Sequence, residues 1–141
     1  AAAQSVVGDA DHLQAAHATC LAATQNPQMD RDVILARGWQ RAQPSVEGGP
    51  EVYLHARNPS LVAITPQGTT CAAMTLIADE TVFENYLARF ASNNPQKNQR
   101  GAYMFCSSQR VTGLQMDRRE QGLVVSAYYT VRTGTDRCAG T

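Results

Sequence analysis

The chain has 141 residues, of which 43% are hydrophobic and 17% are charged, and its twelve basic side chains balance twelve acidic ones. This composition predicts one ordered globular domain over residues 1–141, with residues 1–8 as a disordered tail, and excludes a coiled coil or a wholly disordered chain. The even charge gives no general reason to expect nucleic acid or anionic lipid as a partner.

The first half of the chain predicts two helices followed by four strands. Apolar residues at three- and four-residue steps predict a helix over residues 9–24, capped by Asp9 or Asp11. A shorter helix is expected after it, capped by Asp30 and ended by Gly38. The expected strands are separated by turns rich in proline, asparagine and glycine. They begin at Trp39 and cover Val52–Ala56, Leu61–Thr65 and Thr70–Ile77.

The second half predicts one helix and three strands. Thr81 and Glu84 form a predicted capping box, and Pro95 follows the end of that helix. The strands are expected over Ala102–Ser107, Val111–Met116 and Leu123–Thr133. This order, α-α-β-β-β-β-α-β-β-β, predicts an α+β fold in which two to three helices pack on one face of an antiparallel sheet of about five to six strands. A duplicated half would give such an order, although the residues show no clear repeat.

The four cysteines lie far apart in the sequence, without any Cys-x-x-Cys pair. An even set of this kind predicts disulfides and hence a secreted or periplasmic domain, although buried reduced thiols are the alternative. The start of the chain resembles the remnant of a signal-peptide cleavage site, and no apolar run is long enough to span a membrane. Three pairings are possible, and placement on the predicted elements favours Cys20 with Cys71 and Cys106 with Cys138.

Motifs for known chemistry are absent from the sequence, so neither a catalytic residue nor a cofactor or metal is predicted. Two alternatives stay open. His17 and Cys20 share a helix face and would form a zinc site with His55 or Cys71. Cys71 or Cys106 would instead act as a nucleophile assisted by His55.

Adjacent acidic residues precede the third predicted helix. Asp79 and Glu80 are the remaining candidates for acid catalysis by a carboxylate pair. Carboxylates at the start of a helix ordinarily cap it and complement its dipole. Capping is therefore the expected role of this pair.

The C-terminal part carries residue types typical of protein interfaces. We expect Arg118 and Arg119 in a loop before the last strand, and Tyr128 and Arg132 on that strand's less apolar face, where they would bind a partner. The alternative is a solvated turn with a packed tyrosine. The exposed loop over residues 44–50 is a second candidate surface.

Although the net charge is zero, the charged residues are distributed unequally along the chain. Residues 1–96 hold five basic and nine acidic side chains, a balance of −4, whereas residues 97–141 hold seven basic and three acidic ones, a balance of +4. One part of the surface will be positive if these halves stay apart in the fold, and the charges will be mixed if the halves interleave.

These observations predict a small secreted or periplasmic binding protein without catalytic activity, such as an inhibitor, an immunity-type protein or an accessory protein of an envelope complex, which recognises a protein partner. Two other functions stay open. One is a small hydrolase-like enzyme with a site assembled from scattered residues. The other is a ligand carrier with a pocket between helix and sheet, lined by Trp39, Tyr53, Phe83 and Phe105.

Overall fold

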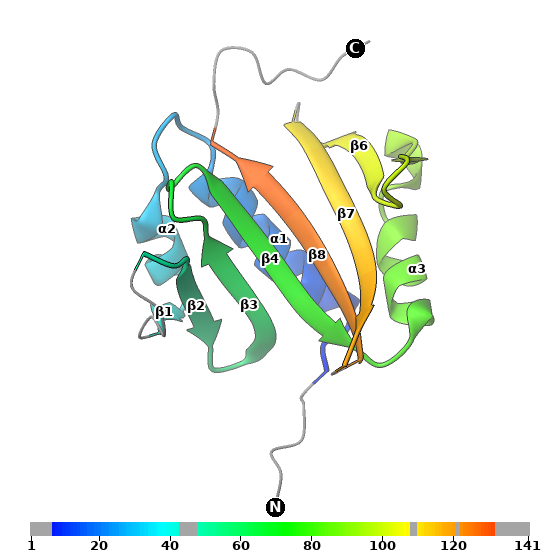
Figure 1. The fold of residues 1–141 in the computed structure, drawn as a ribbon, viewed down its shortest axis with the longest axis horizontal. Coiled ribbons are helices and arrows are strands. Elements are labelled where there is room, and N and C mark those ends of the chain that lie inside the picture. The colour runs from blue at the N-terminus through cyan, green and yellow to red at the C-terminus, as the bar shows by residue number, and fades with distance from the viewer. Residues whose placement is uncertain (1–6, 43–47, 108–109, 121, 132–141) are drawn as a thin grey trace, which may run out of the picture.

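The computed structural model describes residues 7–42, 48–107, 110–120 and 122–131, and Figure 1 shows the arrangement of their helices and strands. The helices are α1 (Ala10–Ala23), α2 (Arg31–Ala36) and α3 (Glu80–Ala88), followed by a short 3₁₀ helix, η1 (Ala91–Asn93). The first four strands are β1 (Trp39–Arg41), β2 (Glu51–His55), β3 (Asn58–Ile64) and β4 (Thr70–Ile77). The last four are β5 (Gln96–Lys97), β6 (Tyr103–Ser107), β7 (Arg110–Arg119) and β8 (Gly122–Thr130).

All described strands form one antiparallel sheet in the order β1-β2-β3-β4-β8-β7-β6-β5. Each half of the chain therefore makes a four-stranded meander, and the last strands of the two meanders pair at the centre, from Thr70 opposite Thr130 to Ile77 opposite Leu123. The predicted α+β class and antiparallel sheet are confirmed, but the sheet has eight strands and not five to six. The unexpected strand, β5, is two exposed residues long, too short to leave an alternating pattern in the sequence.

The helices cover one face of the sheet, with α1 lying behind the central strands (Figure 1). α1 packs on β3, β4 and β8, and both α2 and α3 contact α1. A disulfide between Cys20 of α1 and Cys71 of β4 joins the two layers, with their Cα atoms 5.4 Å apart. Cys106 is disulfide-bonded too. Its expected partner, Cys138, lies outside the described residues.

Two of the predicted helix starts agree with the structure and one does not. Asp9 caps α1 in a capping box with His12, and the Asp30 side chain accepts a hydrogen bond from the Val33 N–H at the start of α2. The capping box predicted from Thr81 and Glu84 is wrong. α3 begins at Glu80 because the carboxylate of Asp79 accepts a hydrogen bond from the N–H of Thr81 at 2.9 Å. Asp79, two residues before Thr81, is therefore the N-cap.

Two strands are longer than predicted. β3 begins at Asn58 although the Asn58-Pro59 pair predicted a break. A register shift between Leu54 and His55 places Pro59 beside an irregular part of the ladder, where its missing N–H is tolerated. β7 continues to Arg119, which pairs with Gly122, so Arg118 and Arg119 lie in a strand and not in a loop.

The predicted N-terminal tail overlaps the folded domain at its last residue. Gly8 is buried, and its N–H donates a hydrogen bond to the carbonyl oxygen of Leu76 at 2.7 Å. Residues 1–6 lie outside the described range. None of the helices in the described part of the chain has both the length and the apolar character needed to cross a membrane.

Candidate functional site

The face of the sheet opposite α1, here called the outer face, is apolar over most of its width. Residues directly opposite one another in a ladder share a face, so the register assigns each residue to one side. Tyr128, Leu54 and Val111 on this face are 47%, 49% and 50% exposed. The other partly exposed apolar residues of the outer face are Val52, Leu61, Met74, Leu76, Met104 and Val124.

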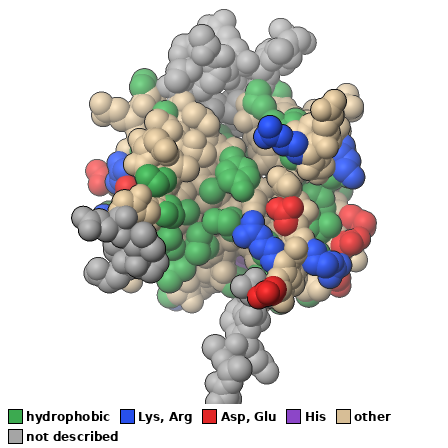
Figure 2. Space-filling model, in the orientation of Figure 1, with side chains coloured by type: hydrophobic (Ala, Val, Ile, Leu, Met, Phe, Trp, Pro, Cys, Tyr) green, Lys and Arg blue, Asp and Glu red, His purple; other side chains and the backbone are tan. Residues whose placement is uncertain are grey.

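Figure 2 views the outer face directly and shows hydrophobic side chains spread over its centre, with charged side chains gathered at the lower right. An antiparallel sheet that has one face in water normally carries polar residues at every second position. Here the outer face is largely apolar over β2, β3 and β4 as well, which is typical of a surface that another molecule covers.

The residues predicted to bind a partner do not form one cluster. Tyr128 lies opposite Gly113, whereas Arg119 lies opposite Gly122 at the other end of the same strand pair. Tyr128 lies six residue steps along β8 from Gly122, a distance of about 20 Å along an extended strand. Arg119 shares the outer face with Tyr128, but Arg118 pairs with Leu123 on the face toward the helices. The fourth residue, Arg132, lies outside the described range, as do residues 44–47 of the predicted binding loop.

The basic and acidic halves of the chain stay apart in the sheet, because β5–β8 form one continuous half of it. From Lys97 to Thr130 the sequence holds five basic residues and two acidic ones, which gives 5 − 2 = +3. The carboxylate of Asp117 accepts a hydrogen bond from the Gln115 side chain at 3.1 Å. Arg119 beside it forms no ion pair within the described part of the chain. The excess of basic residues thus belongs to this half of the sheet as a whole, while the outer face over β7 presents Arg119 next to Asp117.

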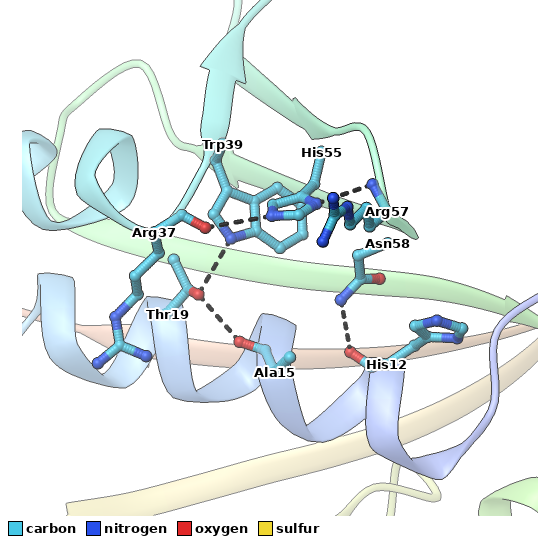
Figure 3. A pocket seen from close by; sticks show the side chains of 8 residues that line it. All are labelled: His12, Ala15, Thr19, Arg37, Trp39, His55, Arg57 and Asn58. Carbon is cyan, nitrogen blue, oxygen red and sulfur yellow. Dashed lines mark hydrogen bonds between the residues drawn. The ribbon is translucent and has the colours of Figure 1, made fainter.

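A pocket lies on the helix side of the sheet, between α1, the start of β1 and the turn from β2 to β3 (Figure 3). Its volume is about 330 Å³, at the small end of the usual range for ligand pockets. The residues that line it are His12, Ala15, Thr19, Arg37, Trp39, His55, Arg57 and Asn58.

Internal hydrogen bonds hold the wall of this pocket in place. The indole N–H of Trp39 donates to Thr19 Oγ1 at 3.1 Å, and that hydroxyl donates to the carbonyl oxygen of Ala15 at 2.9 Å. The His55 ring meets the Trp39 ring edge-on, with centroids 5.1 Å apart. The Asn58 amide donates to the carbonyl oxygen of His12 at 3.1 Å. Thr19, Trp39 and Asn58 thus use their side-chain polar groups within the protein.

Both ring nitrogens of His55 have backbone hydrogen-bond partners. Nε2 lies 3.1 Å from the carbonyl oxygen of Arg37, which only accepts, so this nitrogen carries the proton. Nδ1 lies 3.0 Å from the N–H of Arg57, which only donates, so it holds the lone pair. Because both ring nitrogens are occupied, the geometry gives His55 a structural role and leaves no nitrogen free for a proton transfer.

In the structure, the cysteines proposed as zinc ligands or nucleophiles are disulfide-bonded. Cys20 and Cys71 are joined to each other and Cys106 is also oxidised, so none of these three holds a thiolate to bind zinc or to attack a substrate. Over the described ranges, no three potential ligands of the His, Cys, Asp or Glu type come together as a metal site. Asp79 acts as a helix cap, as expected.

The four aromatic residues predicted to line one carrier pocket are dispersed through the core. Trp39, Tyr53, Phe83 and Phe105 are all at most 6% exposed. Of these, Trp39 lines the pocket of Figure 3, while Phe83 lies on α3 and Phe105 on β6. The pocket of Figure 3 therefore contains one of the four predicted residues and includes basic residues that the prediction did not contain.

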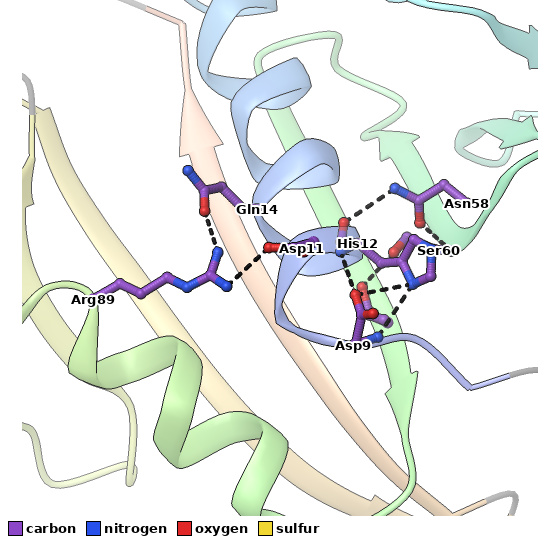
Figure 4. A network of polar contacts seen from close by, with 8 residues as sticks. Asp9, Asp11, His12, Gln14, Asn58, Ser60 and Arg89 are labelled. Atoms are coloured by element: carbon purple, nitrogen blue, oxygen red, sulfur yellow. Dashed lines mark hydrogen bonds and ion pairs between the residues drawn. The ribbon is translucent and has the colours of Figure 1, made fainter.

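Polar contacts fix the end of α1 that borders this pocket (Figure 4). Arg89, directly after α3, donates to Asp11 at 2.9 Å and to the side chain of Gln14, which ties α3 to α1. On the other side Asn58 joins α1 to β3, and its side-chain oxygen Oδ1 accepts a hydrogen bond from the N–H of Ser60 at 2.9 Å. This network orients α1 against the sheet and serves the fold.

Sequence reasoning missed both the outer face and the basic residues of the pocket. The outer face had one signal: residues 61–64 and 71–74 are apolar without alternation, as in strands covered on both faces. The pocket had none, because its residues come from α1, the end of α2 and strands β1 to β3, with no fixed spacing between them. The comparisons with protein-family models, with curated proteins and with solved structures find no match to this chain.

Proposed function

We propose that this chain is an extracytoplasmic, non-catalytic binding protein that recognises a protein partner through the outer face of its sheet. The observation that carries this proposal is the exposure of Leu54, Val111 and Tyr128 on a face that is apolar around them. Isolated apolar residues are ordinary on a protein surface, but a continuous patch across several strands favours a binding surface.

The extent of the outer face suits a protein better than a small molecule. In sheet order, the six strands β2, β3, β4, β8, β7 and β6 span about 29 Å at a spacing of about 4.8 Å. The eight residues of β4 span about 27 Å along the strand. Their product, about 780 Å², is an upper limit that lies close to the roughly 800 Å² that each partner buries in a standard interface. A flat surface of this extent favours contact with a second protein.

The charges at the border of the outer face indicate the chemistry of the partner. Arg119 is exposed beside the apolar centre, and the β5–β8 half of the sheet carries an excess of basic residues. A partner that places apolar side chains over Tyr128 and carboxylates opposite Arg119 would match both features. We therefore propose a different protein with an apolar, acid-bordered surface as the occupant, and not a second copy of this chain.

Disulfide bonds support an extracytoplasmic location, because they persist in oxidising compartments. A secreted or periplasmic inhibitor, an immunity-type protein or an accessory subunit of an envelope complex would all act through such a surface. The occupied ring nitrogens of His55 and the oxidised state of three cysteines favour binding over catalysis.

The experiment places a photo-crosslinking amino acid at Tyr128 and, as a control on the opposite layer, at Asp32 of α2. After irradiation in an extracytoplasmic extract of the source organism, the expected product is a heteromeric adduct formed from position 128 and not from position 32. The captured protein is then purified, and its affinity for the unmodified chain is compared with that for Leu54→Lys and Arg119→Glu. We expect each substitution to weaken binding at least tenfold.

Three results would contradict the proposal. An adduct of twice the chain's own mass would show that the outer face joins two copies. Equal adducts from positions 128 and 32 would show nonspecific contact. Unchanged affinity in Leu54→Lys would place the partner elsewhere on the molecule. Thermal unfolding of each variant serves as the check that the exposed substitutions leave the fold intact.

A further inference from the structure

From the pocket of Figure 3 we infer a second binding site, which takes a small anion, a carboxylate or phosphate ester, carried on a flat apolar body. The pocket opens on the helix side of the sheet, so it is separate from the outer face and the inference stands independently of the proposed protein partner.

The charge of the pocket defines one part of this ligand. The side chains of Arg37 and Arg57 are exposed and both residues line the pocket. In Figure 3 Arg57 lies beside the His55 and Trp39 rings, whereas the Arg37 side chain extends from the far side of Trp39 toward α1. Neither guanidinium forms an ion pair among the residues that the structure describes, and the lining contains no carboxylate. Two unpaired guanidinium groups at one cavity favour a carboxylate or phosphate, which each can bind through two parallel hydrogen bonds.

The wall of the pocket defines the other part. The buried Trp39 ring, 2% exposed, forms the floor of the pocket, and the partly exposed His55 ring packs edge-on against it. Their polar atoms are bonded within the protein, so the wall offers apolar contact, mainly along the His55 ring, but little further hydrogen bonding. A cavity of about 330 Å³ admits a single ring with its substituents and not a long chain. The site therefore suits a compact aromatic or similarly flat anion.

The pocket is formed before any ligand arrives. Gly38 lies in the left-handed region with φ 94°, and a Cβ at this position would stand 2.8 Å from His55 Nε2. The close approach of this backbone keeps the His55 ring edge-on against Trp39. A rigid wall loses little conformational entropy when a ligand binds, which favours affinity for a small molecule.

The experiment uses the fact that Trp39 is the only tryptophan in the chain, so its fluorescence reports on this pocket alone. The probes are sodium benzoate and phenyl phosphate, with benzamide as the neutral analogue and acetate and inorganic phosphate as anions without a ring. We expect saturable changes in fluorescence with benzoate or phenyl phosphate, and binding at least tenfold weaker with benzamide and with the ringless anions. The stronger of the two aromatic anions identifies the preferred head group.

Substitutions test the role of the two arginines. Arg57→Gln and Arg37→Gln are each expected to weaken binding of the aromatic anion about tenfold. Arg41→Gln, on the same strand as Trp39 but outside the pocket, is expected to leave it unchanged. Two-dimensional NMR of the indole N–H provides a second readout. The inference is overturned by the absence of saturable binding in both readouts, by equal binding of benzamide and benzoate, or by full affinity in Arg57→Gln.

Discussion

The hydroxyl of Tyr86 lies 2.7 Å from Nδ1 of His17, and this hydrogen bond joins α3 to α1 inside the core. The two rings meet edge-on with their centroids 5.0 Å apart. Nε2 of His17 has no hydrogen-bond partner within the described residues. Burial lowers the pKa of His17 from 6.5 to about 3, and burial raises the pKa of Tyr86. The imidazole is therefore neutral in the folded protein.

This depressed pKa makes the stability of the fold depend on pH. Between pH 6.5 and about 3 the unfolded chain takes up a proton at His17 and the folded chain does not, so the free energy of unfolding falls as pH falls. The slope reaches at most about 1.4 kcal/mol per pH unit. The contribution of the buried, neutral His17 to the free energy of unfolding is fully present above pH 6.5. Urea unfolding measured at neutral pH and near pH 4.5 provides the comparison.

The control for this prediction is His17→Phe, which removes the titration and keeps an aromatic ring in the core. Carboxylates also titrate in acid, but they contribute equally to both proteins. The loss of stability on acidification is therefore expected to be smaller in His17→Phe than in the unsubstituted chain. Identical losses would show that His17 is accessible to protons in the folded state.

The bond between Cys20 and Cys71 closes a segment with a sequence separation of 51 residues. In the chain-entropy account such a closure stabilises the folded state by about 4 kcal/mol, a large share of the roughly 5 to 15 kcal/mol that holds a domain together. The double substitution Cys20→Ala with Cys71→Ala is expected to lower the free energy of unfolding by about this amount. A decrease below about 1 kcal/mol in urea titration would mean that α1 is held on β4 by packing alone.

The start of α3 gives a test of the cap. Asp79→Ala is expected to lower the free energy of unfolding by about 1 kcal/mol, because it leaves the Thr81 N–H without its acceptor. Thr81→Ala is the matched control, since its side chain does not cap the helix, and its effect is expected within about 0.5 kcal/mol of zero. The opposite ranking in thermal unfolding would restore the capping box predicted from the sequence.

Gly38 tests the packing behind the pocket. Gly38→Ala is expected to lower the free energy of unfolding by about 1 to 3 kcal/mol, through the left-handed backbone and through contact with His55. Gly101→Ala is the control, because Gly101 has a similar φ of 84° but nothing within 4 Å of an added Cβ. Only the Gly38 substitution should also change the fluorescence of Trp39. Equal effects in both would leave backbone strain as the whole cause.

The elements that could be predicted were those with strong local patterns. α1, α2 and β4 combine regular apolar spacing with clear caps or turns, and the structure has them where the sequence predicted them. β5 was missed because two exposed residues carry no pattern. The start of α3 was misplaced because Asp79 and Thr81 are both good caps, and geometry beyond the local sequence decided between them.

The candidate sites were harder to predict because both depend on strand order. The outer face exists as one surface only because β4 pairs with β8, which are far apart in the sequence. Arg119 pairs with Gly122, which lies an even number of residues from Tyr128 along β8. Arg119 and Tyr128 therefore point to the same face. The pairing of β1 with β2 places Arg37 and Arg57 at the same pocket, and no spacing in the sequence indicates that both line it.

The symmetric strand order has a consequence for how other chains can attach. The longest strands lie in the middle of the sheet. Its two edge strands, β1 and β5, are only three and two residues long. Such blunt edges offer few unpaired backbone groups, so they resist strand addition and the stacking of copies into fibres. A protein partner would therefore bind through side chains on a face of the sheet, and not by pairing with its edge strands.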